Sequence, residues 1–123
     1  MIKYDDFAKL DIRVGTVIKA EVPEWSHWVM KLTVDFGFEI GTKTVFSGIM
    51  KFYKPEDLEG KQFPFVVNLE PKSIGPKKEL SEAMMLMAAP QASQSGGQDE
   101  TGEEIPPVLF RITKKVPNGT RIR

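Results

Sequence analysis

Residues 12–22 constrain the fold more than any other part of the chain. The segment is rich in β-branched residues in an alternating pattern, which predicts one long strand. Gly15 lies inside it, and a glycine within a strand indicates a bend or bulge of the kind that the corner of a small barrel requires. The segment therefore favours a closed or nearly closed sheet.

The remaining apolar segments complete a five-stranded Greek-key barrel. Strands are expected at residues 28–36, 43–46, 62–69 and 82–89, with a last strand at 108–112. Residues 54–58 place a proline and two acids at the start of a short helix between the third and fourth strands. Pro64 predicts a bulge or an edge position for its strand. The fold class is all-β, with short helical segments and extra elements at both termini.

The chain of 123 residues has no cysteine and one histidine, His27. The absence of cysteine excludes a disulfide scaffold, a thiol nucleophile and a thiolate metal site. With a single histidine, the chain has too few ligands for a histidine-based zinc site and only one candidate base for a Ser-His triad. No nucleophile elbow, phosphate-binding glycine loop or acid/base pair is present. We therefore expect no enzyme, no catalytic residue, no metal site and no cofactor.

The N-terminal residues are acidic and lack the apolar core of a secretory signal. The longest apolar run, residues 83–90, is far too short to cross a bilayer. The length and the apolar content fit one compact domain that can bury a core without a staple. We expect a cytoplasmic protein that does not associate with membranes.

Acids and bases are equal in number, 17 of each, which by itself argues against a nucleic-acid binder. Their distribution weakens that argument. Residues 93–107 hold four acids and no base, whereas residues 108–123 hold five bases and no acid. Without the acidic stretch the chain has a net charge of +4. This asymmetry is compatible with a basic face, and equally with a solvated loop beside a solvated strand.

Residues 68–89 bear most directly on function. They join two apolar strands through a Pro/Gly loop that carries Lys72, Lys77 and Lys78 and is followed by Ser81. The lysines are suited to phosphates, and the Ser81 hydroxyl with nearby backbone N–H groups is suited to a sugar-phosphate chain or a base edge. The alternative is a solvated loop whose lysines keep it soluble, followed by a strand in which Met84 belongs to the core.

Two tryptophans, Trp25 and Trp28, lie in the connection between the first two strands. Loops at this position of small barrels bind single-stranded nucleic acid, and an aromatic ring there adds about 1–3 kcal/mol for each stacked base. The alternatives are that one ring packs in the core, or that both lie at a dimer interface or a peptide-binding patch.

The pattern Asn68-Leu-x-Pro followed by Ser81-Glu-x-Met-x-Leu-x-Ala resembles the tRNA-binding domain family. That family includes free-standing tRNA-binding proteins, the C-terminal module of methionyl-tRNA synthetases and CsaA-type export chaperones. The resemblance implies one OB-fold domain over residues 1–123. Within it, the composition of residues 90–107, rich in Gln, Ser, Gly and acids, predicts a long flexible acidic loop. It also implies that Asn68, Ser81 and Met84 belong to a tRNA-binding surface.

This chain departs from the family pattern at residues 75–80, where members usually have a shorter Arg-Gly loop, and at Ala83, where many have glycine. It also lacks the Asn-Ala-Asp-Lys-Leu element that the tRNA-binding modules have near Trp25.

The motifs at residues 21–24, 35–41 and 53–56 are similar to those of the CsaA branch. Two functions follow from the resemblance: a non-catalytic protein that recognises the backbone and shape of tRNA, or a chaperone that binds unfolded or exported polypeptides. The basic loop favours the first function, whereas the tryptophans and the Met-rich strand favour the second. The resemblance further implies a homodimer that pairs through residues 4–12 and 116–123. The alternative is that the N-terminal apolar residues plug their own barrel.

Overall fold

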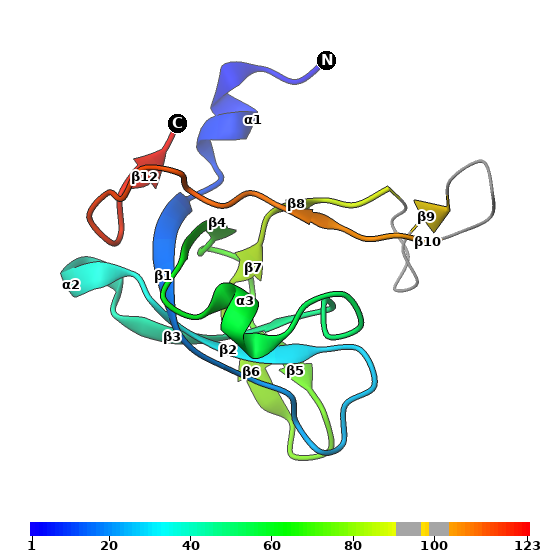
Figure 1. Cartoon of the computed structure of the whole chain (residues 1–123). Helices are drawn as coiled ribbons and strands as arrows, with labels where there is room; N and C mark the ends of the chain where they lie inside the picture. The colour runs from blue at the N-terminus through cyan, green and yellow to red at the C-terminus, as the bar shows by residue number, and fades with distance from the viewer. Residues whose placement is uncertain (91–96, 99–103) are drawn as a thin grey trace.

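The structure is a computed structural model that describes residues 1–90, 97–98 and 104–123. Five antiparallel strands form its body in the order β3-β2-β1-β4-β7 (Figure 1). They are β1 (Ile12–Glu21), β2 (Met30–Asp35), β3 (Thr42–Ser47), β4 (Gln62–Val66) and β7 (Met84–Met85). The short helix α3 (Pro55–Leu58) joins β3 to β4, as the sequence predicts.

The two ends of this sheet almost meet, so the barrel is nearly closed. The N–H of Glu82, just before β7, donates to the carbonyl of Thr44 on β3 over 2.8 Å. The N–H of Phe46 on β3 donates to the hydroxyl of Ser81 over 3.0 Å. The predicted five-stranded Greek-key barrel is therefore confirmed.

Strand β1 is long because it belongs to both halves of the barrel. Its first half pairs with β4, and its second half pairs with β2. Of the bend or bulge predicted at Gly15, a bulge at this residue is wrong: Gly15 pairs regularly with Phe63, and the register shifts instead between Val17 and Lys19. Gly15 instead allows close packing: a Cβ there would lie 2.5 Å from Val34 Cγ1 and 2.7 Å from Phe36 Cε1.

The edge or bulge position predicted for Pro64 is also wrong. Strand β4 lies between β1 and β7, and Pro64 pairs with Val14 in regular register. The carbonyl of Pro64 accepts the N–H of Leu86 over 3.1 Å, but proline has no N–H to return the bond. The ladder with β7 stops at this point, so the segment predicted as one strand at 82–89 divides into β7 and β8 (Met87–Ala88).

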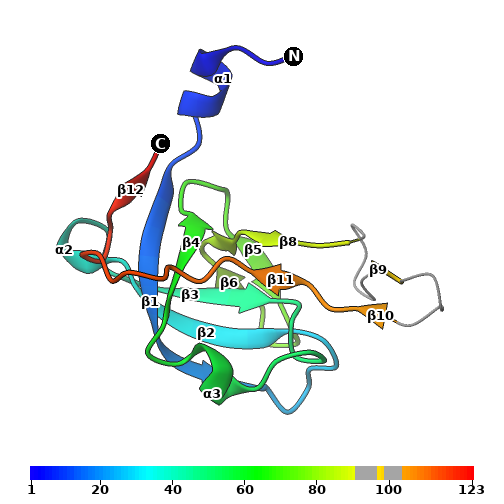
Figure 2. The ribbon, with the colours of Figure 1, turned by 45° about the horizontal axis from the view of Figure 1, so that its top comes forward.

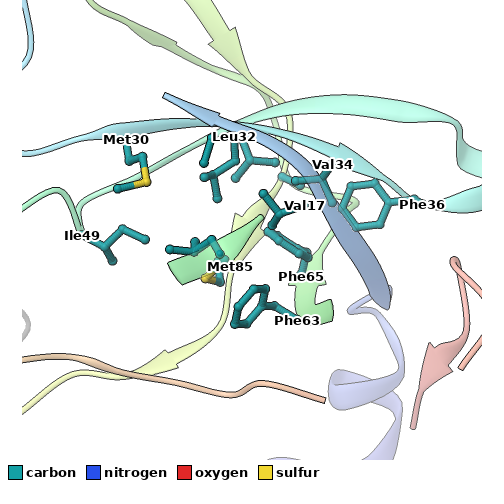
Figure 3. Packing of buried hydrophobic residues seen from close by; sticks show 13 residues of the cluster. Val17, Met30, Leu32, Val34, Phe36, Ile49, Phe63, Phe65 and Met85 are labelled. Atoms are coloured by element: carbon teal, nitrogen blue, oxygen red, sulfur yellow. The ribbon is translucent and has the colours of Figure 1, made fainter. Parts of the chain in front are cut away.

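The core lies between the two halves of the barrel. Figure 3 shows Val34, Phe36 and Phe65 pointing toward one another from β2, the residue after it and β4. The Phe36 and Phe65 rings meet edge to face with centroids 5.2 Å apart. Both side chains are fully buried, and each such ring contributes about 3–5 kcal/mol, the usual cost of its replacement by alanine.

Short elements surround the barrel. Helix α1 (Tyr4–Ala8) stands away from it near the N-terminus, and α2 (Gly37–Ile40) forms the turn after β2 (Figures 1 and 2). The predicted strand at 108–112 reduces to β11 (Val108–Leu109), which pairs with β8. The expected flexible loop at 90–107 includes residues 91–96 and 99–103, which lie outside the described residues. Within that range β9 (Gly97–Gln98) pairs with β10 (Glu104–Ile105).

The C-terminal segment crosses the barrel from β11 to β12 (Arg121–Ile122), which pairs with β1 (Figure 2). The buried side chain of Gln62 holds it: Nε2 donates to the Val116 carbonyl over 2.7 Å, and Oε1 accepts the Val116 N–H over 3.1 Å. Arg13 donates to Asp11 over 2.6 Å and to the Gly119 carbonyl over 3.1 Å. The bond to Asp11 raises the pKa of Arg13, so its guanidinium stays charged.

In the part of the chain that the structure describes, none of the helices has the length and apolar character that spanning a membrane requires.

Candidate functional site

The basic stretch predicted as a loop is a β-hairpin. It consists of β5 (Lys72–Ile74) and β6 (Glu79–Ser81), and Lys72 pairs directly with Ser81. The turn begins with Gly75 at φ 78° and ends with Lys78 at φ 53°, both in the left-handed region. Lys77 and Lys78 therefore lie at the tip of a defined hairpin, with Lys72 at its base.

Trp25 supports this hairpin. A Cβ on Gly75 would lie 2.5 Å from Trp25 Cζ2, so the indole ring packs directly under the turn. The indole also lies 6.1 Å from the ring of Phe46, centroid to centroid. Trp25 is half-buried and packs against the turn that carries Lys77 and Lys78. The sequence shows no link between Trp25 and Gly75, because the residues are far apart in the chain.

A cavity of about 300 Å³ opens beside the hairpin. Lys72, Ser81 and Met84 line it together, so the structure brings three of the predicted site residues into one place. Val29, Phe46 and Ala83 supply apolar walls. Met84 is 54% exposed and projects beside the cavity instead of entering the core.

The three lysines are not engaged in ion pairs within the described residues, although Glu70 lines the cavity together with Lys72. Lys72, Lys77 and Lys78 are exposed, and their side chains make no ion pair or hydrogen bond with another described residue. Of the acids near the hairpin, Glu79 is already paired with Lys31 at 3.2 Å. The hairpin can therefore receive anions without first breaking an internal ion pair.

Asn68 and Ser81 have structural roles besides any contact with a ligand. The Asn68 amide accepts the N–H of Asp11 over 2.9 Å and donates to the carbonyl of Lys9 over 2.7 Å, which fixes the junction of α1 and β1. The Ser81 hydroxyl accepts the N–H of Phe46, as described above, and lies 3.4 Å from the carbonyl of Ala83. Ser81 faces the cavity, whereas Asn68 is not among its lining residues.

Trp28 does not join Trp25 at the hairpin. It is 40% exposed and lies over Gly48, where a Cβ would be 3.4 Å from its Cδ1. The two tryptophans predicted as a pair thus occupy separate places. Among the described residues, no group of three or more His, Cys, Asp or Glu side chains is arranged to hold a metal ion.

Comparisons with known proteins identify relatives of this chain. The chain resembles the methionine–tRNA ligases of two Bacteroides fragilis strains, with 45% identity over 87 residues, which cover 71% of this chain and 12% of each ligase. It therefore spans a small part of these curated relatives.

Two solved structures match over nearly their whole length. The MetRS-related protein from Pyrococcus horikoshii has a TM-score of 0.80 and 35% identity, covering 100% of this chain and 98% of that one. The chaperone CsaA from Bacillus anthracis has a TM-score of 0.78 and 36% identity, with 100% and 99% covered. The family model described as "Putative tRNA binding domain" matches residues 12–121. The chain therefore belongs to the tRNA-binding domain family.

Proposed function

We propose that residues 1–123 act as one non-catalytic unit in the cytoplasm that binds tRNA through the β5–β6 hairpin and recognises its backbone and shape. The observation that carries the proposal is the set of three unpaired lysines beside a cavity lined by Ser81 and Met84. Membership of the tRNA-binding domain family supports it.

The expected chemistry is contact with phosphates. Each lysine that meets a phosphate releases condensed counterions, so the affinity depends on the salt concentration. Lys72, at the base of the hairpin, and Lys77 and Lys78, at its tip, present charge along its length. Ser81 and Met84 are uncharged and lie beside Lys72, so they would contact a sugar or a base edge next to the phosphate. Such contacts add specificity and neutralise no charge.

The test replaces Lys72, Lys77 and Lys78 together by alanine and measures tRNA affinity over a salt series. We expect weaker binding and a salt slope that falls by roughly one unit for each lost phosphate contact. The matched control replaces Lys9, Lys19 and Lys54, which are exposed and lie elsewhere. It removes the same charge and should change the slope much less. An unchanged affinity and slope in the hairpin variant would contradict the proposal.

A second candidate function, binding of unfolded or exported polypeptides, is favoured by apolar exposure around the same cavity. Leu69 and Met84, which line the cavity, are 42% and 54% exposed, and Leu80, on the opposite face of the hairpin, is 51% exposed. Methionine adapts to varied apolar partners, and a grouped apolar surface indicates binding. The likeness to the CsaA chaperone supports this candidate. Trp28, exposed at a separate place, would extend the contact to a longer peptide.

Replacement of Leu69 and Met84, which line the cavity, by aspartate tests this second candidate. If polypeptides bind here, the variant loses affinity for a fluorescently labelled unfolded protein. Ile18→Asp is the control, because Ile18 is 54% exposed and lies on β1. Equal peptide affinity of the variant and the control would refute this candidate.

We further propose a homodimer that pairs through α1 and the C-terminal residues. Helix α1 buries none of its residues, and Ile2, Tyr4 and Leu10 are 73%, 74% and 41% exposed. Apolar side chains that stand away from their own barrel are suited to an isologous contact. Light scattering at micromolar concentration should give twice the mass of one chain, and Tyr4→Asp with Leu10→Asp should halve it. A one-chain mass for the unmodified protein, with or without tRNA, would disprove the dimer.

A further inference from the structure

We propose that a second groove, between α3 and the C-terminal segment, binds a nucleoside phosphate. The ligand is either an unpaired nucleotide of a bound RNA or a free nucleotide. The RNA arm rests on the proposed function, whereas the free-nucleotide arm is independent of it.

The groove consists of two adjoining cavities of about 430 and 230 Å³. They adjoin at Lys61 and Arg111, which line both. The aromatic residues Phe52 and Tyr53 line the larger cavity only, and Lys115 lines the smaller cavity only. The larger cavity alone falls in the range of about 300–1,000 Å³ that small-ligand sites occupy. One end is therefore aromatic and the other is cationic.

The cationic end is suited to a phosphate. Among the described residues that line the smaller cavity, Lys61, Arg111 and Lys115 carry charge and no carboxylate is present. Arg111 and Lys115 make no side-chain hydrogen bond or ion pair with another described residue. Lys61 donates to the backbone carbonyl of Asp57 over 2.8 Å, which leaves its ammonium two further donors. A guanidinium and two ammonium groups match the three oxygens of a phosphate.

The aromatic end is suited to a base. Phe52 and Tyr53 are half-buried, and the Tyr53 hydroxyl donates to the Pro107 carbonyl over 2.5 Å, which fixes its ring. Aromatic rings bind bases of any identity by stacking. The carboxylate of Asp57 lines the same cavity and can accept a hydrogen bond from an exocyclic amine. A simple inorganic anion would use the cationic end alone.

The wall that carries Arg111 is fixed before a ligand arrives. The N–H of Ile112 donates to the carbonyl of Gln62 over 2.9 Å, and the Gln62 side chain holds Val116 as described above. A wall held on both sides of the cations costs less ordering free energy on binding than a free tail would.

The groove is separate from the hairpin site. The two cavities that form it share no lining residue with the cavity beside the hairpin. In Figure 1 the hairpin β5–β6 lies at the opposite end of the barrel from the C-terminal segment. A folded RNA as large as tRNA can reach both, whereas a mononucleotide reaches one at a time.

The test follows backbone amide signals by NMR while adenosine 5′-monophosphate, inorganic phosphate or a short single-stranded RNA is added. We expect adenosine monophosphate to shift the amides of Gly60 and Thr113 at the cationic end and of Phe52 and Tyr53 at the aromatic end. Arg111→Ala with Lys115→Ala should weaken this binding about tenfold or more, the loss expected for charge-assisted hydrogen bonds. Lys9→Ala with Lys19→Ala is the control of equal charge.

Each outcome decides the proposal. Absence of shifts in the groove up to millimolar nucleotide would overturn it, and so would equal shifts with inorganic phosphate that leave Phe52 and Tyr53 unaffected. If the double variant also weakens tRNA binding, the nucleotide belongs to the RNA; if tRNA binding is unchanged, a free nucleotide is the ligand. The proposed function is tested separately by the alanine variant of Lys72, Lys77 and Lys78. If that variant binds tRNA normally, the proposed function fails, whereas binding of adenosine monophosphate to the groove is unaffected.

Discussion

The hairpin and the C-terminal groove present basic charge in two different ways. The hairpin carries Lys72, Lys77 and Lys78 close together in the sequence, on a two-stranded extension that Trp25 supports. The groove gathers Lys61, Arg111 and Lys115 from segments that only the fold brings together. Changes at the hairpin should therefore alter binding with little cost to the barrel. Changes that loosen the groove should also loosen the attachment of the C-terminal segment.

The largest effect should come from Gln62→Ala, which tests the coupling of the groove to the fold. Gln62 is 6% exposed and bonds both backbone groups of Val116 and the side chain of Asn118. Loss of these bonds and the burial of their unpaired partners should cost about 2–4 kcal/mol of unfolding free energy. Urea denaturation measures the total.

Hydrogen exchange then locates the effect of Gln62→Ala. The amides of Ile112 and Val116 should exchange faster, while those of the β5–β6 hairpin keep their protection relative to the global stability. If the hairpin amides lose protection as much as the C-terminal ones, the two regions are not independent.

The next effect in size should come from Gly75→Val, which changes the hairpin alone. The left-handed backbone costs about 1–2 kcal/mol for a residue with a Cβ, and a β-branched side chain would also meet the Trp25 ring. We expect weaker tRNA binding and a shifted Trp25 fluorescence, measured in a Trp28→Phe background. Binding of adenosine monophosphate to the groove should not change.

Gly41→Val is the matched control for this variant. Gly41 also has a positive φ, +84°, and a Cβ there would meet nothing within 4 Å; its ψ of −162° lies in a region essentially restricted to glycine, so valine there costs backbone strain of its own. It should carry the backbone cost without displacing the hairpin. Equal effects of the two variants on tRNA affinity would show that the contact with Trp25 does not position the lysines.

The barrel could be predicted from the sequence because its signals are local. Alternating apolar residues indicate strands, and Pro55 with the acids after it indicates the α3 helix. The wrong predictions concern residues whose role depends on a partner that is remote in the sequence. Gly15 makes room for Val34 and Phe36 rather than for a bulge, and Pro64 is accommodated because its missing N–H falls at the end of β7.

The candidate sites also divide into features with a local sequence signal and features that depend on remote contacts. Lys72, Lys77 and Lys78 were visible because they are close in sequence, although their arrangement on a hairpin was not. The support by Trp25 and the groove around Arg111 depend on tertiary contacts between remote segments, which no local pattern encodes. The structural bonds of Asn68 and Ser81 are equally remote, so their roles in holding β1 and β3 could not be separated from ligand contact.

A smaller effect should come from Ser81→Ala, which separates support of the barrel from contact with RNA. Loss of the bond from the Phe46 N–H should cost about 1 kcal/mol of stability. Because a hydroxyl releases no counterion, the salt slope of tRNA binding should stay unchanged even if affinity falls. A reduced slope would mean that the substitution displaces the neighbouring Lys72.

The smallest effect on stability should come from Lys78→Gly, and its sign sharpens the comparison. Lys78 has φ 53°, a conformation that costs about 1–2 kcal/mol for a residue with a Cβ. Glycine removes that cost but adds about 0.5–1 kcal/mol of chain entropy, so the variant should be slightly more stable in urea denaturation. Its tRNA salt slope should nevertheless fall by roughly one unit. Lys77→Gly removes the same charge at a position without positive φ, and should be less stable instead. If Lys78→Gly were less stable than the parent and kept its full salt slope, Lys78 would hold the turn rather than a phosphate.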